Sequence, residues 1–230
     1  MRALEKVFKD EKSLSAHAKI LVTGGMETDV DENDRKIIAS RADEAARVLQ
    51  ARYGLSKDEV ESIGGPGSTM GNSAAASIYI RDHKELEHVT ELEAVTNDYH
   101  MLRTWIMFSA GFLMAKTGER LDKIISDDDE RTIRDILDDA TAKLDDPDWN
   151  GGEIKKTRDT VMDILKNYFD KPGVIKVKPL VAEEEIEKDG SPEEKRYAMR
   201  LRTHPRVKDM LKREYNGIKQ VLDGTYKGKF

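Results

Sequence analysis

The stretch MLRTWIMFSAGFLMA, residues 101–115, is the most apolar part of the chain and decides which kind of fold can form. Because it is apolar on every side of a helix, it predicts a helix at the centre of a core. Its 15 residues, which include Arg103, are fewer than the ~20 that a transmembrane helix needs. A regular apolar stripe precedes it, so we expect one long central helix from about residue 82 to 116, ended by Gly118.

Helical spacing of apolar residues recurs on both sides of this stretch. The other expected helices lie within residues 1–24, 37–54, 56–64, 119–125, 126–145, 154–170 and 206–224. Gly54 stands where a left-handed C-cap belongs. The expected fold class is therefore mainly α, a multi-helix body with one long central helix and a minor β-hairpin near the C-terminus.

The hairpin is one of two interpretations of the segment after residue 171. VIKVKPLV (174–181) alternates like a strand, and Pro179 restricts it to a sheet edge. KRYAMRLR (195–202) also alternates, and Asp189-Gly190 is a hairpin signal. Against this, Ser191-Pro192-Glu193-Glu194 is a capping box typical of a helix start. We favour the hairpin because the alternation extends over more residues than the cap does.

Charge is unevenly distributed along the chain. Residues 195–230 contain eleven Lys and Arg against three Asp and Glu, a net charge of +8, whereas the whole chain carries −6 and residues 1–194 therefore carry −14. The expected domains follow this division: an acidic helical body (1–170), a β-hairpin or arm (171–204), and a basic amphipathic C-terminal helix and tail (205–230). A basic segment on an acidic body can bind nucleic acid or the acidic face of another copy.

One glycine-rich stretch, GGPGSTMGNS (64–73), looks like a phosphate-binding loop. Such a loop needs glycine, four residues and then Gly-Lys-Ser/Thr, between a strand and a helix. Here Pro66 replaces the first glycine, Asn72 replaces the lysine, and we expect a helix before the stretch. We interpret it as a connection in which Asn72 or Ser73 caps the next helix. KILVTGG (19–25) lacks the further glycines of a dinucleotide fold, and we assign it to the end of a helix.

The sequence indicates no cofactor and no metal. Glu85 and His88 have Glu-x-x-His spacing, but a di-iron bundle needs two such motifs and two more glutamates. The acidic run 127–130 lacks the alternating ligands and the glycine of a calcium loop. The chain contains no cysteine, and the G-x-S-x-G motif of a serine nucleophile is absent. We therefore expect no catalytic residues and no enzyme, with a helical enzyme using a carboxylate or metal site as an alternative.

The candidate functional residues are the cations of the C-terminal part, because Arg and Lys contact carboxylates and phosphates. They are Lys176, Lys178, Arg196, Arg200, Arg202, Arg206, Lys208, Lys212, Arg213 and Lys219. The leading hypothesis is a non-enzymatic structural or assembly protein, such as a virus or phage particle component. It would self-associate or dock in a larger complex by placing this basic segment on an acidic protein surface. The alternative is nucleic-acid binding through residues 195–230.

The N-terminal sequence MRALEKVFKDEK contains no apolar run typical of a signal peptide. The absence of cysteine is consistent with a reducing compartment. We expect a protein that is cytoplasmic or part of a particle assembled inside a cell, without a membrane partner.

Overall fold

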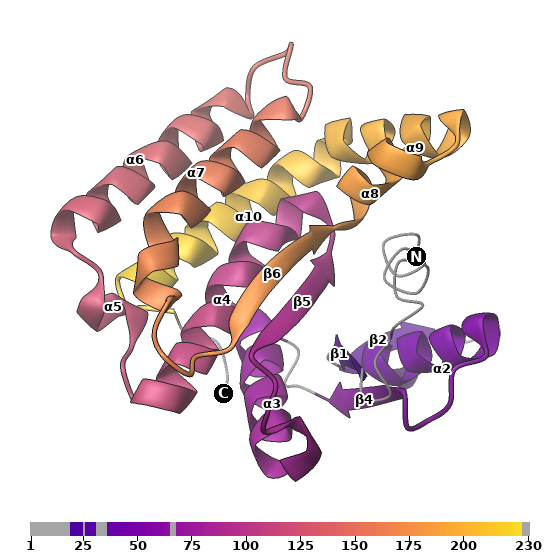
Figure 1. The fold of residues 1–230 in the computed structure, drawn as a ribbon. Coiled ribbons are helices and arrows are strands. Elements are labelled where there is room, and N and C mark those ends of the chain that lie inside the picture. The colour runs from indigo at the N-terminus through magenta and orange to yellow at the C-terminus, as the bar shows by residue number, and fades with distance from the viewer. Residues whose placement is uncertain (1–18, 25, 31–35, 65–67, 227–230) are drawn as a thin grey trace. The chain divides into compact units, whose positions relative to one another are not determined.

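The computed structural model describes residues 19–24, 26–30, 36–64 and 68–226. They divide into two compact units, which we call the N-terminal unit (described residues 19–88) and the C-terminal unit (described residues 89–226). Helices predominate over strands, so the mainly α fold class is confirmed (Figure 1). The border between the units lies near residue 88, inside the segment that we expected to be one helical body.

The N-terminal unit combines two pairs of strands with two helices. Its strands are β1 (Ile20–Gly24), β2 (Met26–Val30), β3 (Lys36–Ser40) and β4 (Val60–Gly64), and its helices are α2 (Arg41–Tyr53), α3 (Thr69–Asp82) and the short 3-10 helix η1 (Lys84–Leu86). β1 pairs with β4 in parallel, whereas β2 and β3 are antiparallel. Both α2 and α3 pack against the β1–β4 pair, in which Val60 and Ile63 are buried.

Three expected helices of this unit contain strands: residues 37–40 of the helix expected over 37–54 belong to β3, and the other two cases lie at 1–24 and 56–64. The structure has β1 where we expected the end of a helix over 1–24, and β4 at the end of the expected helix 56–64. A short apolar run of a parallel strand cannot be told from a helical segment by periodicity alone. Residues 1–18 of the first expected helix lie outside the described residues. Helix α2 is confirmed over 41–53, and Gly54 ends it with φ at +68°.

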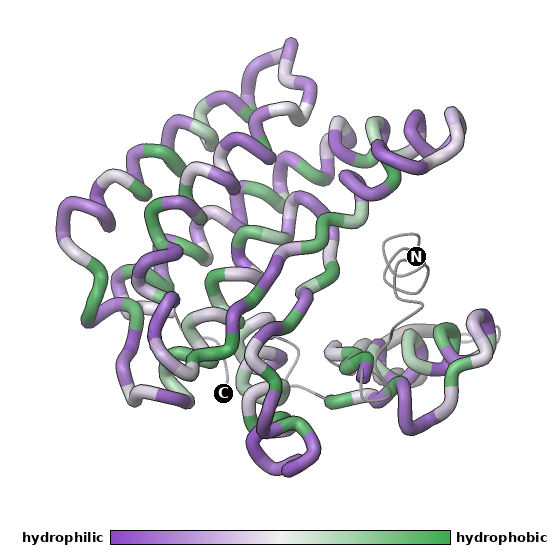
Figure 2. The backbone as a smooth tube through the Cα atoms, viewed as in Figure 1, coloured by the Kyte–Doolittle hydropathy of each residue, from purple (hydrophilic) through white to green (hydrophobic). Residues whose placement is uncertain are grey.

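The C-terminal unit is built around α4. Its elements are β5 (Glu91–Thr96), α4 (Asp98–Thr117), α5 (Leu121–Ile124), α6 (Asp127–Lys143), α7 (Gly152–Phe169), β6 (Lys176–Val181), α8 (Ala182–Asp189), α9 (Pro192–Thr203) and α10 (Pro205–Leu222). Helix α4 packs against α7, α10 and both strands, and its Met101, Ile106, Met107 and Leu113 are fully buried. Hydrophilic and hydrophobic segments alternate along α6 and α7, which pack on each other (Figure 2).

The expected long helix is corrected at its N-terminal half. Helix α4 begins at Asp98, and residues 91–96 form strand β5 instead. Leu92 and Ala94 of β5 are less exposed than Glu91, Glu93 and Val95, so the strand buries alternate residues. The same apolar positions also fit a helical stripe, which is why the sequence pattern concealed the strand.

The expected β-hairpin over 171–204 is wrong, although its first strand exists. β6 covers residues 176–181, but it pairs in parallel with β5, with Glu91 opposite Lys176 and Thr96 opposite Val181. The second expected strand is helix α9. Ser191 begins it with a complete capping box, because its side chain accepts from Glu194 N–H while the Glu194 carboxylate accepts from Ser191 N–H. Only Ala198 of α9 is buried, so alternating arginines and apolar residues fit a mostly exposed helix.

No helix within the described residues is long and apolar enough to cross a membrane.

Candidate functional site

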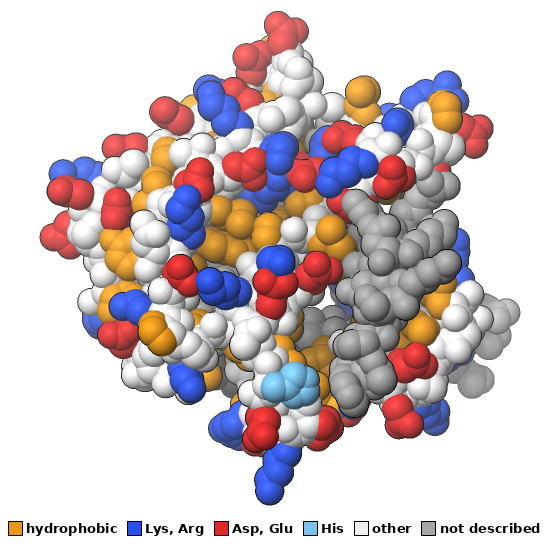
Figure 3. Space-filling model, in the orientation of Figure 1, with side chains coloured by type: hydrophobic (Ala, Val, Ile, Leu, Met, Phe, Trp, Pro, Cys, Tyr) orange, Lys and Arg blue, Asp and Glu red, His pale blue; other side chains and the backbone are white. Residues whose placement is uncertain are grey.

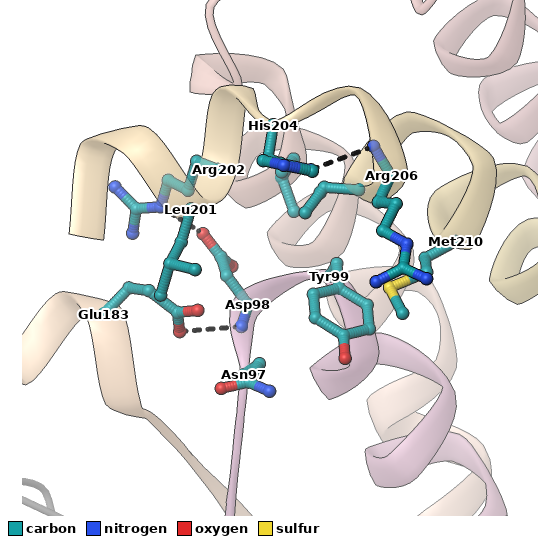
Figure 4. A pocket seen from close by; sticks show the side chains of 11 residues that line it. Asn97, Asp98, Tyr99, Glu183, Leu201, Arg202, His204, Arg206 and Met210 are labelled. Atoms are coloured by element: carbon teal, nitrogen blue, oxygen red, sulfur yellow. Dashed lines mark hydrogen bonds and ion pairs between the residues drawn. The ribbon is translucent and has the colours of Figure 1, made fainter. Parts of the chain in front are cut away.

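The candidate site lies where strands β5 and β6 end. Because Thr96 pairs with Val181 in a parallel register, both strands end at the same edge. Helix α4 follows one strand end and helix α8 follows the other. In parallel sheets this carboxyl edge is the usual place for a ligand. Here it borders a pocket of about 300 Å³ between α4, α8, α9 and α10 (Figure 4).

The walls of the pocket are partly apolar and partly charged. The apolar part comes from Tyr99, Ile154, Leu201, Val207 and Met210. The polar part comes from Asn97, Asp98, Glu183, Arg202, His204 and Arg206. Figure 4 shows that these polar side chains come from three directions, namely the starts of α4 and α8 and the connection between α9 and α10.

Asp98 is the charged centre of the pocket floor. This first residue of α4 is only 2% exposed. Its Oδ1 accepts a hydrogen bond of 2.7 Å from Arg158 Nη1, and its Oδ2 lies 2.9 Å from Arg202 Nε. Burial raises the pKa of Asp98, and the two guanidinium groups oppose that rise. The carboxylate also lies at the positive end of the α4 dipole, which favours its ionised form.

The two arginines extend this contact to other helices. Arg158 of α7 is 3% exposed and also contacts Glu184 of α8. Arg202 of α9 likewise forms a second ion pair, with Glu187 of α8. Four helices, α4, α7, α8 and α9, are therefore joined through one buried carboxylate and the two guanidinium groups that neutralise it.

Glu183 caps helix α4 from outside the helix. The residue before α4, Asn97, makes no side-chain capping bond. Instead Glu183 Oε2 accepts a hydrogen bond of 2.9 Å from Asp98 N–H. Burial of Glu183 raises the pKa of its carboxyl group, while this hydrogen bond opposes the rise. The pocket therefore contains a carboxyl group that takes up a proton more readily than an exposed glutamate does.

We expect Glu183→Gln to become more stabilising as the pH increases. A carboxyl group whose pKa is higher in the folded state favours folding below its unfolded pKa, and that contribution is lost as the pH rises through the folded pKa. The glutamine oxygen can still accept from Asp98 N–H but carries no charge. Urea unfolding of the variant and the wild-type protein between pH 4 and 8 measures the difference. Glu193→Gln, at an exposed position, is the control, and a Glu183→Gln difference that does not change with pH contradicts the expectation.

The structure distributes the ten predicted cations over several surfaces. Lys176 and Lys178 do not share a strand face with Arg196, Arg200 and Arg202, because those arginines lie on helix α9. Among the described residues, five of these ten cations form ion pairs with acidic side chains of the same chain. The pairs are Lys176–Asp170, Lys178–Glu91, Arg202–Asp98, Lys212–Asp145 and Lys219–Asp138.

Three further cations of this set lie on α10. Lys208 Nζ donates to the backbone oxygen of Asp146 at 3.2 Å and lies 5.1 Å from the centre of the Trp149 ring. Arg206 and Arg213 are exposed. Of the ten, only Arg202 and Arg206 meet at the pocket. Two cations of the basic segment therefore pair with acidic groups of α6 and the connection after it, Lys219 with Asp138 and Lys212 with Asp145.

Sequence reasoning did not identify Asp98, Glu183 or Arg158 as site residues. The signal for Asp98 was present, since Asn97-Asp98 follows the apolar run of β5 as a helix start follows a strand. It was missed because residues 82–116 were expected to form one helix. Nothing in the sequence distinguishes Glu183 or Arg158 from other charged residues of helical segments.

The glycine-rich stretch belongs to the N-terminal unit. A strand does precede it, because β4 ends at Gly64, so the expected preceding helix is wrong. Helix α3 begins at Thr69 and is capped by Ser68, whose Oγ accepts from Gly71 N–H at 3.0 Å; the expected caps were Asn72 or Ser73. Residues 65–67 lie outside the described residues. The stretch still differs from a phosphate-binding loop in sequence, because Pro66 replaces the first glycine and Asn72 replaces the lysine.

No group of three or more His, Cys, Asp or Glu could hold a metal ion in the part of the chain that the structure describes. No family model, curated protein or solved structure matches this chain.

Proposed function

We propose that the C-terminal unit binds a small organic anion in the pocket between α4, α8, α9 and α10. The observation that carries this proposal is that two long helices begin at the same pocket. Helix α4 has 20 residues and starts at Asp98, and helix α10 has 18 residues and starts at Pro205. A helix N-terminus favours negative charge through its dipole.

A guanidinium group at the pocket wall also favours an anion. The negative charge of Asp98 is already compensated by Arg158 and Arg202. Arg206 lies at the wall with an exposed side chain, and no ion pair of this guanidinium is found among the described residues. His204, also exposed, accepts from Arg206 N–H through Nδ1 at 3.2 Å. One arginine is therefore available for a carboxylate or phosphate, which it can bind in bidentate geometry.

The apolar wall sets the second requirement on the ligand. Tyr99, Leu201, Val207 and Met210 would contact a group without charge. Ligand pockets typically combine such apolar walls with a few placed polar groups. An aromatic or aliphatic carboxylate or phosphate fits this combination, whereas inorganic phosphate would use only the polar part.

We expect phenyl phosphate and benzoate to raise the Tm of the protein, and inorganic phosphate to raise it less at equal concentration. Isothermal titration calorimetry of Arg206→Gln should give affinity at least about tenfold lower, since a charge-assisted hydrogen bond contributes ~1.5–3 kcal/mol. Arg213→Gln is the matched control, because Arg213 is an exposed arginine of α10 outside the pocket. Equal loss in both variants, or no binding of either organic anion at about 10 mM, would reject the proposal.

A further inference from the structure

We propose that helix α9 of one molecule packs along helix α6 of a second copy of the chain. This contact is separate from the pocket, because it uses the outward side chains of α9. The contact assigns the self-association that we expected from the sequence to two defined surfaces, one on α9 and one on α6.

Exposed apolar side chains also lie on α9. Outside the pocket, which Leu201 and Met210 line, the large apolar side chains exposed on this helix are Tyr197 and Met199. Tyr197 and Met199 have the greatest exposure among the large apolar residues of the described chain, at 56% and 67%. In Figure 3 basic and hydrophobic side chains lie together at the outer end of α9, at the upper right. Such a surface is typical of a protein contact.

The charges on α9 define an ordered pattern. Glu193, Arg196 and Arg200 are all exposed, and the structure of the described residues gives none of the three an ion pair. Their spacings of three and four residues place them on one face of the helix. Read from the N-terminal end, this face presents one negative charge followed by two positive charges.

Helix α6 carries the opposite pattern. Its exposed residues Arg131, Asp135 and Asp139 are spaced by four residues and so share one face. Asp135 and Asp139 form no ion pair within the described ranges, and Arg131 Nη1 lies 3.7 Å from Asp128. When the two helices lie parallel, Glu193 faces Arg131, Arg196 faces Asp135 and Arg200 faces Asp139. Each charge then meets one of opposite sign.

The two surfaces belong to different sides of one molecule. Helix α6 packs on α7 and α10, whereas α9 packs on α8 and α10. Figure 1 shows α6 and α9 at separate sides of the C-terminal unit. The contact must therefore join two molecules, with different surfaces on each. A contact of this kind closes into a ring or continues as a chain. Because its ion pairs are exposed, it should be weak and sensitive to salt.

A charge exchange tests the contact. One variant combines Arg196→Glu with Arg200→Glu, and the other combines Asp135→Arg with Asp139→Arg. Sedimentation equilibrium at low salt and up to about 1 mM protein should show association of the wild-type chain. Each variant alone should associate at least about tenfold more weakly, whereas an equal mixture of the two should associate again. Addition of about 1 M salt should weaken the wild-type association.

The control combines Lys156→Glu with Arg213→Glu. It changes the net charge by the same amount as the α9 variant, at exposed positions outside these two faces. It should associate like the wild-type chain. A wild-type chain that stays monomeric, or a mixture that does not recover, overturns the proposal. One further result also overturns the proposal. If the α9 variant loses low-salt binding of polyglutamate or single-stranded DNA while its self-association is unchanged, α9 has another partner. Circular dichroism confirms that each variant is folded.

Discussion

Replacement of Arg158 by methionine will lower the free energy of unfolding of the C-terminal unit by about 3–5 kcal/mol. The guanidinium group is 3% exposed and contacts Asp98, which is 2% exposed. Methionine fills much of the same volume but leaves the Asp98 carboxylate with Arg202 alone, and it removes the contact with Glu184. The cost comes mainly from a buried charge that has lost a partner, because an intact buried ion pair contributes little net stability.

Urea unfolding followed by tryptophan fluorescence measures this effect. Trp105 and Trp149 are the two tryptophans of the chain, and both lie in the C-terminal unit. The double variant Arg158→Met with Asp98→Asn removes the buried carboxylate that has lost one of its two partners, and it should recover a large part of the lost stability. Lys156→Met, an exposed change on the same helix, should have a much smaller effect. A loss below about 1 kcal/mol, or a double variant less stable than the single one, contradicts this explanation.

The helices that the sequence predicted well are those that bury one stripe. Helix α6 buries Ile133, Leu137 and Ala140 at spacings of four and three, and its start is marked by Ser126 and four acidic residues. Helix α10 was predicted by the same periodicity. In such helices the local pattern and the tertiary packing agree, so the sequence alone is sufficient.

The strands were harder to predict, because parallel pairing is not a local property. Strand β6 was recognised, but its partner β5 lies 85 residues earlier by register, with Glu91 opposite Lys176. No turn signal connects such strands, whereas the hairpin that we expected has one at Asp189-Gly190. The hairpin was favoured because residues 195–202 alternate over a longer stretch than the cap covers, but the capping box at Ser191 proved to be the stronger signal.

The candidate site was predicted only in part, for the same reason. Arg202 and Arg206 were named because they are basic, but their place at a pocket depends on how α9 and α10 meet α4. Asp98, Arg158 and Glu184 are brought together from three helices. Asp98 and Arg158 are buried, and Glu184 is half-buried, only because those helices pack, so composition and spacing do not show that the three side chains meet.

Trp105→Ala should destabilise the C-terminal unit by about 3–5 kcal/mol. The Trp105 side chain is 5% exposed, and its Nε1–H donates to the backbone oxygen of Val177 at 2.9 Å. Its ring meets Phe169 edge to face, with 5.2 Å between the ring centres. The residue therefore joins α4 to strand β6 and to the end of α7, and truncation would leave a cavity at this junction and an unpaired oxygen on Val177.

A second substitution separates packing from hydrogen bonding. Trp105→Phe keeps an aromatic ring but removes the donor, so it should cost less, about 1–3 kcal/mol, for the unpaired buried oxygen. Trp149 remains in both variants as a fluorescent reporter of unfolding in the same unit. Because β6 leads directly into α8, which supplies Glu183 and Glu184, loosening this strand should also weaken binding of phenyl phosphate in the pocket. Equal stability of the alanine and phenylalanine variants would show that the ring contributes little beyond its donor, and a wild-type-like alanine variant would contradict the central place of Trp105 in this core.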